Sequence, residues 1–100
     1  MSECCLTLLA PPAIHERLLD ALLMTAQVSL FSSSAAAVHG LADHRMAANE
    51  QVLGRAAMTQ VQVLLSLRDR ETVLAGLAEQ FTGSGLRYWV TPVLDVGEFA

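Results

Sequence analysis

Two histidines and a carboxylate stand close together in the polar stretch VHGLADHRMAANEQVLGR, which runs from Val38 to Arg55. His39, Asp43 and His44 follow the spacing His-x₃-Asp-His. Neutral imidazole is a good ligand for zinc, copper or nickel. We therefore expect His39 and His44 to bind a transition metal ion, with a further donor from a neighbouring subunit. The alternative interpretation is a solvated segment whose histidines bind nothing.

Cys4 and Cys5 are the only two cysteines, and they are adjacent, so the chain has no disulfide framework. On a strand, neighbouring side chains point to opposite faces, so one thiol would face the core and the other a second surface. Both could be small buried apolar residues, or one could be a thiolate metal ligand. The sequence holds no nucleophile motif and no phosphate-binding glycine signature, so we expect no enzymatic activity.

The elements that must position these residues follow from hydrophobic periodicity. Residues 3–10 are apolar at nearly every position, which is typical of a strand covered on both faces. Apolar stripes at helical spacing follow twice, the second with Asp69 as an expected N-cap and Gly83 as the glycine that ends the helix. The predicted elements are strand 3–10, helix 12–24, strand 27–38, strand 56–67, helix 69–81 and strand 86–96.

This order, β-α-β-β-α-β, predicts an α+β, ferredoxin-like fold for a single domain over residues 1–100. Four antiparallel strands would carry two helices on one face, and a polar insert at about 39–54 would join the second and third strands. Pro92 places the last strand at an edge of the sheet or at a bulge. The other face of the sheet would be open and partly apolar, with Cys5, Leu9, Leu64 and either Trp89 or Val93 on it.

Composition favours association with other copies of the chain. Apolar residues make up 53% of the 100 residues and charged residues 16%, against a typical charged share of about 25%. A small monomer has little interior in which to bury such an excess. The net charge of −4 and the lack of a basic run argue against nucleic acid as a partner. No segment resembles an export signal or a membrane span, so we expect a cytoplasmic protein that is not itself inserted in a membrane.

In two places the sequence resembles the PII-like family of small signalling proteins. Val38-His39-Gly40 resembles the Val-Arg-Gly that opens the long loop of that family, and the insert occupies the position of that loop. The stretch TGSGLRYWVTPVLDV resembles the family pattern TG…GDGKIFVSPVEEA. The matching residues are Thr82, Gly83, Gly85, Arg87, Val90 and Pro92. The similarity is greatest to an uncharacterised branch found with heavy-metal efflux systems.

The resemblance implies a homotrimer formed through the sheets, with a small effector bound at the subunit clefts. It implies a long loop that signals to a partner protein, and a membrane transporter is the partner suggested by analogy. The effector-binding residues that it implies are Gly40 at the loop base, Thr82 and Gly83 in the glycine loop, and Arg87 in place of the family lysine. Arg45 in the insert is a further candidate from its charge, because it could contact an anionic ligand, or it could simply be a solvated residue of the loop.

The identity of the effector stays open at this point. Asp95 and Glu98 stand where the family has arginines, which argues against ATP bound in the usual way. A transition metal ion is the other candidate, because CutA-like metal-binding proteins share the trimeric plan. In that alternative the protein would sense or buffer the metal through His39 and His44.

Overall fold

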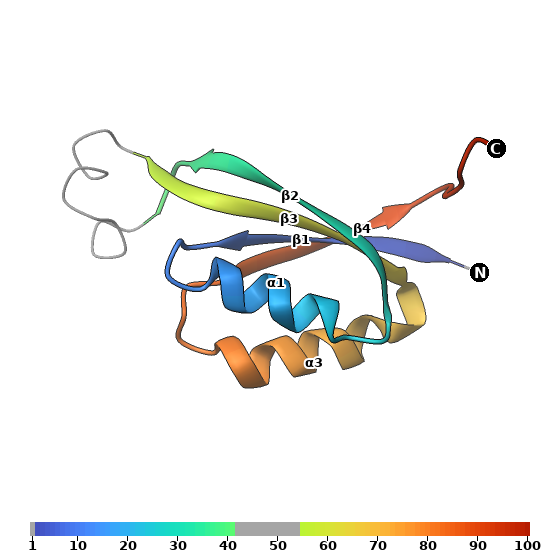
Figure 1. Ribbon diagram of the computed structural model, residues 1–100, viewed down its shortest axis with the longest axis horizontal. Helices are drawn as coiled ribbons and strands as arrows, with labels where there is room; N and C mark the ends of the chain where they lie inside the picture. The colour runs from blue at the N-terminus through green and yellow to red at the C-terminus, as the bar shows by residue number, and fades with distance from the viewer. Residues whose placement is uncertain (1, 42–54) are drawn as a thin grey trace.

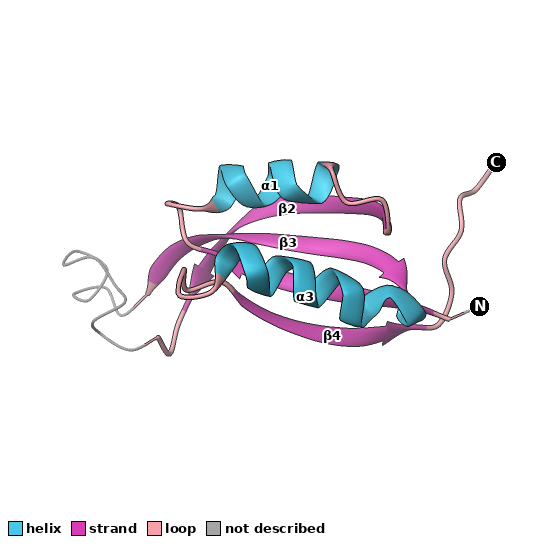
Figure 2. Cartoon of the chain, turned by 90° about the horizontal axis from the view of Figure 1, so that it is seen from below, coloured by secondary structure: helices cyan, strands magenta, loops and turns pink. Residues whose placement is uncertain are grey.

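The computed structural model describes residues 2–41 and 55–100, which form one antiparallel sheet and two α-helices. The strands lie in the order β2-β3-β1-β4, and both helices cover the same face of the sheet (Figures 1 and 2). This arrangement confirms the predicted α+β, ferredoxin-like fold. The elements are β1 (Glu3–Ala10), α1 (His15–Leu23), β2 (Val28–Val38), β3 (Ala56–Ser66), a 3₁₀ helix (Leu67–Asp69), α3 (Arg70–Phe81) and β4 (Arg87–Val93).

Strand β1 is the centre of the molecule, because it is hydrogen-bonded to β3 on one side and to β4 on the other. Cys4, Leu6 and Leu8 face the helices and belong to the main core. On the opposite face, Leu9 packs with Met58 and Ala56 of β3 in a second, smaller cluster. Every residue from Leu6 to Ala10 is buried, which agrees with the prediction of a strand covered on both faces.

Both helices bury the stripes expected from their sequences. Ile14, Leu18 and Leu22 are buried beneath α1, and Val73, Leu77 and Phe81 beneath α3. Helix α1 begins at His15, later than the predicted residue 12, because the chain first makes a turn in which the Ile14 N–H donates to the Pro11 carbonyl at 3.1 Å.

Asp69 holds the N-cap position of α3, but the prediction that its side chain caps the helix is wrong. The 3₁₀ helix runs directly into α3, so the backbone of Asp69 is already helical, with φ −91° and ψ −3°. An N-cap side chain normally bonds the first turn from an extended backbone. In this geometry Asp69 makes no side-chain cap hydrogen bond.

The two edges of the sheet are β2 and β4. The edge position of β4 confirms the interpretation of Pro92, which has no N–H to give to a ladder. Strand β4 ends at Val93 and not at the predicted residue 96, because Val93 pairs with Glu3, the residue at which β1 begins. Beyond Val93 the chain leaves the sheet and projects from the body (Figure 1).

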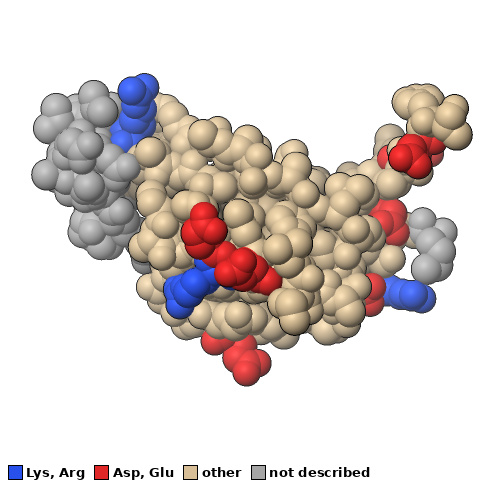
Figure 3. Space-filling model, viewed as in Figure 1, with Lys and Arg blue, Asp and Glu red and all other residues tan. Residues whose placement is uncertain are grey.

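The face of the sheet opposite the helices is open and partly apolar. The register places Leu30 beside Leu64, Leu64 beside Cys5, and Trp89 beside Thr7 on this face. Leu30 is 61% exposed and Trp89 is 47% exposed. In Figure 3 the charged atoms gather over the helices and at the two ends of the molecule. Among the described residues no helix is long and apolar enough to cross a membrane.

Two adjacent leucines of α1 give a matched test of this packing. Leu22 is 1% exposed and Leu23 is 72% exposed. We expect Leu22→Ala to lower the free energy of unfolding by about 2–5 kcal/mol, because it leaves a cavity in the core. Leu23→Ala should change it by less than about 0.5 kcal/mol. Urea denaturation of both variants measures the difference, and equal losses would contradict the assignment of the buried face.

Candidate functional site

A tight turn rich in glycine joins α3 to β4, and its conformation depends on glycine at two positions. Gly83 has φ +80° and Gly85 has φ +88°, in the left-handed region that favours glycine. Gly83 follows the last residues of α3, as predicted for a helix-ending glycine. Thr82 donates its hydroxyl hydrogen to the Ala78 carbonyl, which satisfies a carbonyl in the last turn of the helix.

Ser84 holds the rest of the turn together. Its hydroxyl donates to the Phe81 carbonyl at 2.5 Å, and the Leu86 N–H donates back to the Ser84 hydroxyl oxygen at 3.2 Å. The Ser84 backbone N–H also donates to the Phe81 carbonyl oxygen, at 3.1 Å. Within the described residues, no hydrogen bond uses the N–H of Gly83 or Gly85. Unused backbone N–H groups in a turn of this kind can bind an anionic group.

The base of the 39–54 insert meets this glycine turn. Leu41 packs on the second core cluster beside Leu9 and Met58. A hollow of about 190 Å³ lies where these segments meet. It is lined by Pro11, Leu41, Met58, Gly83, Ser84, Gly85 and Arg87. Four stretches that are far apart in the sequence therefore form one small concave surface.

A larger groove of about 670 Å³ lies on the other side of the turn, between α3 and the start of β4. Most of its lining is apolar, with Leu74, Ala78 and Phe81 from the helix and Leu86 and Tyr88 from the strand side. Thr82, Gly83, Gly85 and Arg87 also line it, so the glycine turn separates this groove from the smaller hollow.

The structure brings together part of the predicted effector site. Gly83 and Arg87 line both cavities, and Thr82 lines the larger one. Gly40 precedes Leu41 at the loop base and has φ +87°, so it supplies a turn there. Arg45 lies outside the described residues. Sequence reasoning missed Leu41, Met58 and Tyr88, because only their apolar character was visible and that predicts packing.

The predicted metal ligands are only partly within the described residues. His39 is exposed at the end of β2, whereas Asp43 and His44 lie outside the described part of the chain. Among residues 2–41 and 55–100, no group of three or more histidine, cysteine, aspartate or glutamate side chains could hold a metal ion. The metal-binding hypothesis thus depends on residues of the insert.

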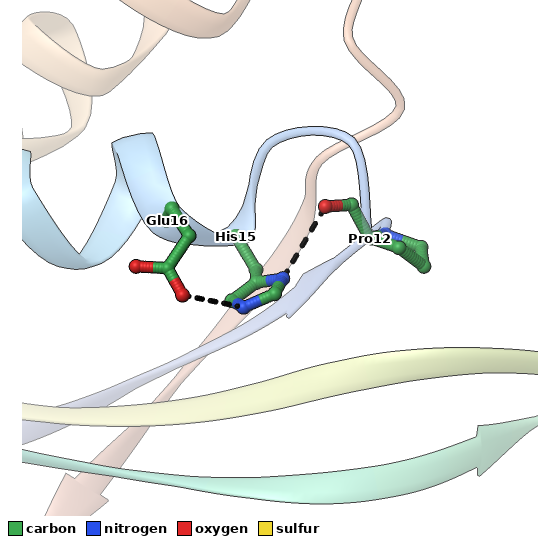
Figure 4. A network of polar contacts seen from close by, with 3 residues as sticks. All are labelled: Pro12, His15 and Glu16. Atoms are coloured by element: carbon green, nitrogen blue, oxygen red, sulfur yellow. Dashed lines mark hydrogen bonds and ion pairs between the residues drawn. The ribbon is translucent and has the colours of Figure 1, made fainter.

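His15 is the first residue of α1 and lies far from the glycine turn in sequence. Its side chain makes local contacts at the start of the helix. Its Nδ1 is 3.3 Å from the Pro12 carbonyl and its Nε2 is 3.1 Å from Glu16 Oε1 (Figure 4). Both nitrogens face oxygen acceptors, and both contacts are hydrogen bonds only when the ring carries two protons. These contacts assign His15 a local structural role.

The two cysteines have different surroundings. Cys4 is completely buried in the main core, whereas Cys5 is half-buried on the open face, 3.9 Å from the Thr7 hydroxyl. Burial raises the pKa of the Cys4 thiol above its ordinary value of 9.0, and the nearby Arg70 opposes this only in part. A buried thiol that stays protonated is a poor nucleophile and a poor metal ligand.

The turn itself can be tested with two glycines. We expect Gly83→Ala to destabilise the fold by about 1–2 kcal/mol, because a side chain in the left-handed region is strained. Gly76 lies inside α3, and an added Cβ there would touch nothing within 4 Å. Gly76→Ala should therefore stabilise the fold by up to about 1 kcal/mol. Thermal denaturation gives both values, and a neutral Gly83→Ala would contradict the strained turn.

The raised pKa of Cys4 predicts a pH dependence of stability. Above pH 9 the thiol ionises in the unfolded chain but stays protonated in the folded one, so stability falls as the pH rises towards the pKa of the folded state. We expect the free energy of unfolding of the Cys4→Ala variant to lack this alkaline decline. Cys5→Ala is the control and should keep it. Urea denaturation at pH 8 and pH 10 checks the slope, and a decline preserved in Cys4→Ala would be the contrary result.

Comparisons with known proteins identify the family. The chain is similar to a DUF3240 family protein from Shewanella baltica OS155, known from a crystal structure at 2.40 Å, with a TM-score of 0.82 and 19% identity over 100% of this chain and 99% of that one. It is also similar to a Bacillus cereus protein related to NIF3, with a TM-score of 0.71 and 13% identity over 97% of this chain but 26% of that chain. No curated protein matches. The family described as "Protein of unknown function (DUF3240)" matches residues 1–100, and the chain belongs to that family.

Proposed function

We propose that this chain is a PII-like regulatory protein. In this proposal it forms a homotrimer and binds a small effector at the clefts between subunits. The long loop at 39–54 then reports the bound state to a partner protein. The chain acts by binding, and the proposal assigns it no catalytic step.

The observation that carries the proposal is the meeting of the loop base with the glycine turn. Leu41 at the loop base and Gly83–Gly85 of the turn line one hollow, together with Arg87. An effector bound in that hollow would touch both the turn and the segment that leads into the loop. Binding would thereby favour one arrangement of the loop over others, which is the requirement for a ligand-driven switch.

The chemistry of the hollow suits an effector with an anionic group. Arg87 is exposed, lines the hollow and provides a permanent positive charge. The N–H groups of Gly83 and Gly85 are directed hydrogen-bond donors of the kind that surround phosphate or carboxylate groups. Because Asp95 and Glu98 are acidic, a polyphosphate held by residues after β4 is disfavoured, and a smaller anion fits better.

The open face of the sheet supports association. Leu30, Leu64 and Trp89 lie on a face that neither α1 nor α3 covers. Burying such side chains between copies contributes roughly 25 cal/mol for each Å² of apolar surface removed from water. A subunit interface on this face would also bring the clefts of neighbouring chains together. The partner is proposed to be a membrane transporter, and that part depends on family analogy.

Thermal denaturation with a panel of ligands tests the proposal. The panel contains phosphate, AMP, ADP, ATP, cyclic AMP, zinc, copper and nickel. A ligand that binds only the folded state stabilises it by about 2.7 kcal/mol at one hundred times its Kd. We expect one of the anions to raise the Tm of the wild type by several degrees. Light scattering on the same samples should give three times the 10.7 kDa mass of the chain.

Matched variants locate the site. Arg87→Ala should abolish the anion-dependent rise in Tm, whereas Arg68→Ala should keep it, because Arg68 is also exposed but follows the far end of β3. The His39→Ala/His44→Ala variant should also keep it. A rise produced by a metal and lost in that double-histidine variant would instead support the metal-binding alternative. No rise with any ligand, or a clean monomer, would overturn the regulatory proposal.

A further inference from the structure

The segment that follows β4 exposes large apolar side chains on a projecting arm. Residues 94–100, here called the C-terminal arm, have the sequence LDVGEFA. Leu94 is 95% exposed, Val96 is 53% exposed and Phe99 is fully exposed. In Figure 1 the arm extends away from the sheet and both helices. The other described residues leave these three neighbouring apolar side chains uncovered, and a group of exposed apolar side chains is consistent with a segment that packs on another molecule.

The groove between α3 and β4 has the size and chemistry to receive such a segment. Its volume of about 670 Å³ is comparable with that of a small-ligand pocket. Its walls are mainly aliphatic and aromatic, with Leu74, Ala78 and Phe81 on the helix and Tyr88, 56% exposed, on the strand. A phenyl ring and a branched aliphatic side chain would replace water on these walls.

Strand β4 adds a backbone surface beside the groove. It is an edge strand in the sheet of the described residues, so its outer N–H and C=O groups have no strand partner there. A groove between a helix and an edge strand is a common receptor for an extended peptide, which pairs with the edge and inserts alternate side chains. Leu94 and Val96 alternate in this way along the arm, and Phe99 follows after Gly97, outside this alternation.

Charge also matches between the arm and the groove. The arm carries Asp95 and Glu98, and its acidic atoms appear on the projecting segment in Figure 3. Of the described residues that line the groove, Arg87 is the one charged residue. A guanidinium beside an approaching carboxylate steers the two surfaces together and fixes their direction.

The arm of the same chain is poorly placed to fill this groove. Strand β4 starts at the glycine turn, beside the groove, and its seven residues lead away over roughly 20 Å at 3.3 Å per residue. The arm begins at the far end of β4 and continues outward (Figure 1). To reach its own groove it would have to reverse and retrace nearly the whole strand, whereas the arm of a neighbouring copy can approach directly.

We propose that the C-terminal arm docks in the groove between α3 and β4 of a second copy of this chain, with Phe99 among its apolar anchors and the arm carboxylates near Arg87. The site is incomplete without the partner copy, which supplies its occupant. This inference goes beyond the proposed regulatory function, since it assigns a swapped segment and its receptor and needs no effector.

Cysteine cross-linking tests the contact. Two versions of the chain, both with Cys5→Ala, are co-expressed, one with Ala78→Cys in the groove and one with a removable tag and Ala100→Cys in the arm, which leaves Phe99 in place. Ala78 and Ala100 are both exposed, so neither substitution disturbs the core. We expect a mixed disulfide-linked dimer of the two versions on a non-reducing gel after mild oxidation without any effector.

The control replaces Ala78→Cys with Met24→Cys, at an 86% exposed position at the end of α1, outside the groove. Its yield of mixed dimer should be severalfold lower. Far-ultraviolet circular dichroism confirms that each version folds. Mixed dimer formed equally with the control, or none with Ala78→Cys in folded protein, would overturn the proposal. The cross-linking experiment uses no ligand, so its failure would not change the interpretation of the thermal denaturation with ligands. Failure of the thermal denaturation experiment would likewise leave the cross-linking result valid.

Discussion

The arrangement of the whole molecule depends on the burial of β1 on both of its faces. The strand lies between β3 and β4 and is covered by helices on one side, where Leu6 and Leu8 enter the main core. On the other side Thr7 and Leu9 are buried although α1 and α3 both lie on the opposite face. Their neighbours there are the side chains of adjacent strands and the loop base. This second, thin layer of packing connects the base of the 39–54 insert to the centre of the sheet, because Leu41 belongs to it.

That constraint explains why the candidate site lies at one end of the sheet. Beyond Ala10 the chain turns into α1, and β2 and β3 continue as a two-stranded ribbon, in which Ala56 pairs with Val38. The glycine turn before β4 reaches the same end. Pro11, Met58 and the turn are therefore neighbours because β1 ends between its two partners. The unequal lengths of the strands create the hollow at this end.

Much of the fold could be predicted from the sequence because its strands and helices have clear hydrophobic periods. The continuous apolar run of β1, the stripe of Val73, Leu77 and Phe81, and the edge position of Pro92 all agree with the structure. The errors lie at the ends of elements. The turn at Pro11–Ile14 and the end of β4 opposite Glu3 depend on tertiary neighbours, and a local pattern contains no information about them.

The candidate site was less predictable for a related reason. Gly83 and Arg87 were indicated by their place in a motif, but Leu41 and Met58 look like ordinary core residues until the fold brings them to the turn. The prediction that the Asp69 side chain caps α3 was wrong because a 3₁₀ helix leads into α3, and the local sequence does not predict that 3₁₀ helix. Arg45 and His44 lie outside the described residues, so their roles stay predictions.

The position of β1 in the sequence also sets the order in which this fold can be completed. Its two partners begin only at Ala56 and Arg87, so the earliest strand of the domain is paired by the latest ones. Contacts between such distant segments close slowly, because long loops must be ordered before any pairing is gained. During synthesis the apolar run from Leu6 to Ala10 would thus lack any sheet neighbour until β3 has emerged, and would lack its second neighbour until β4 has emerged. Chaperones that bind short apolar segments could therefore bind this strand for longer than any other strand of the domain.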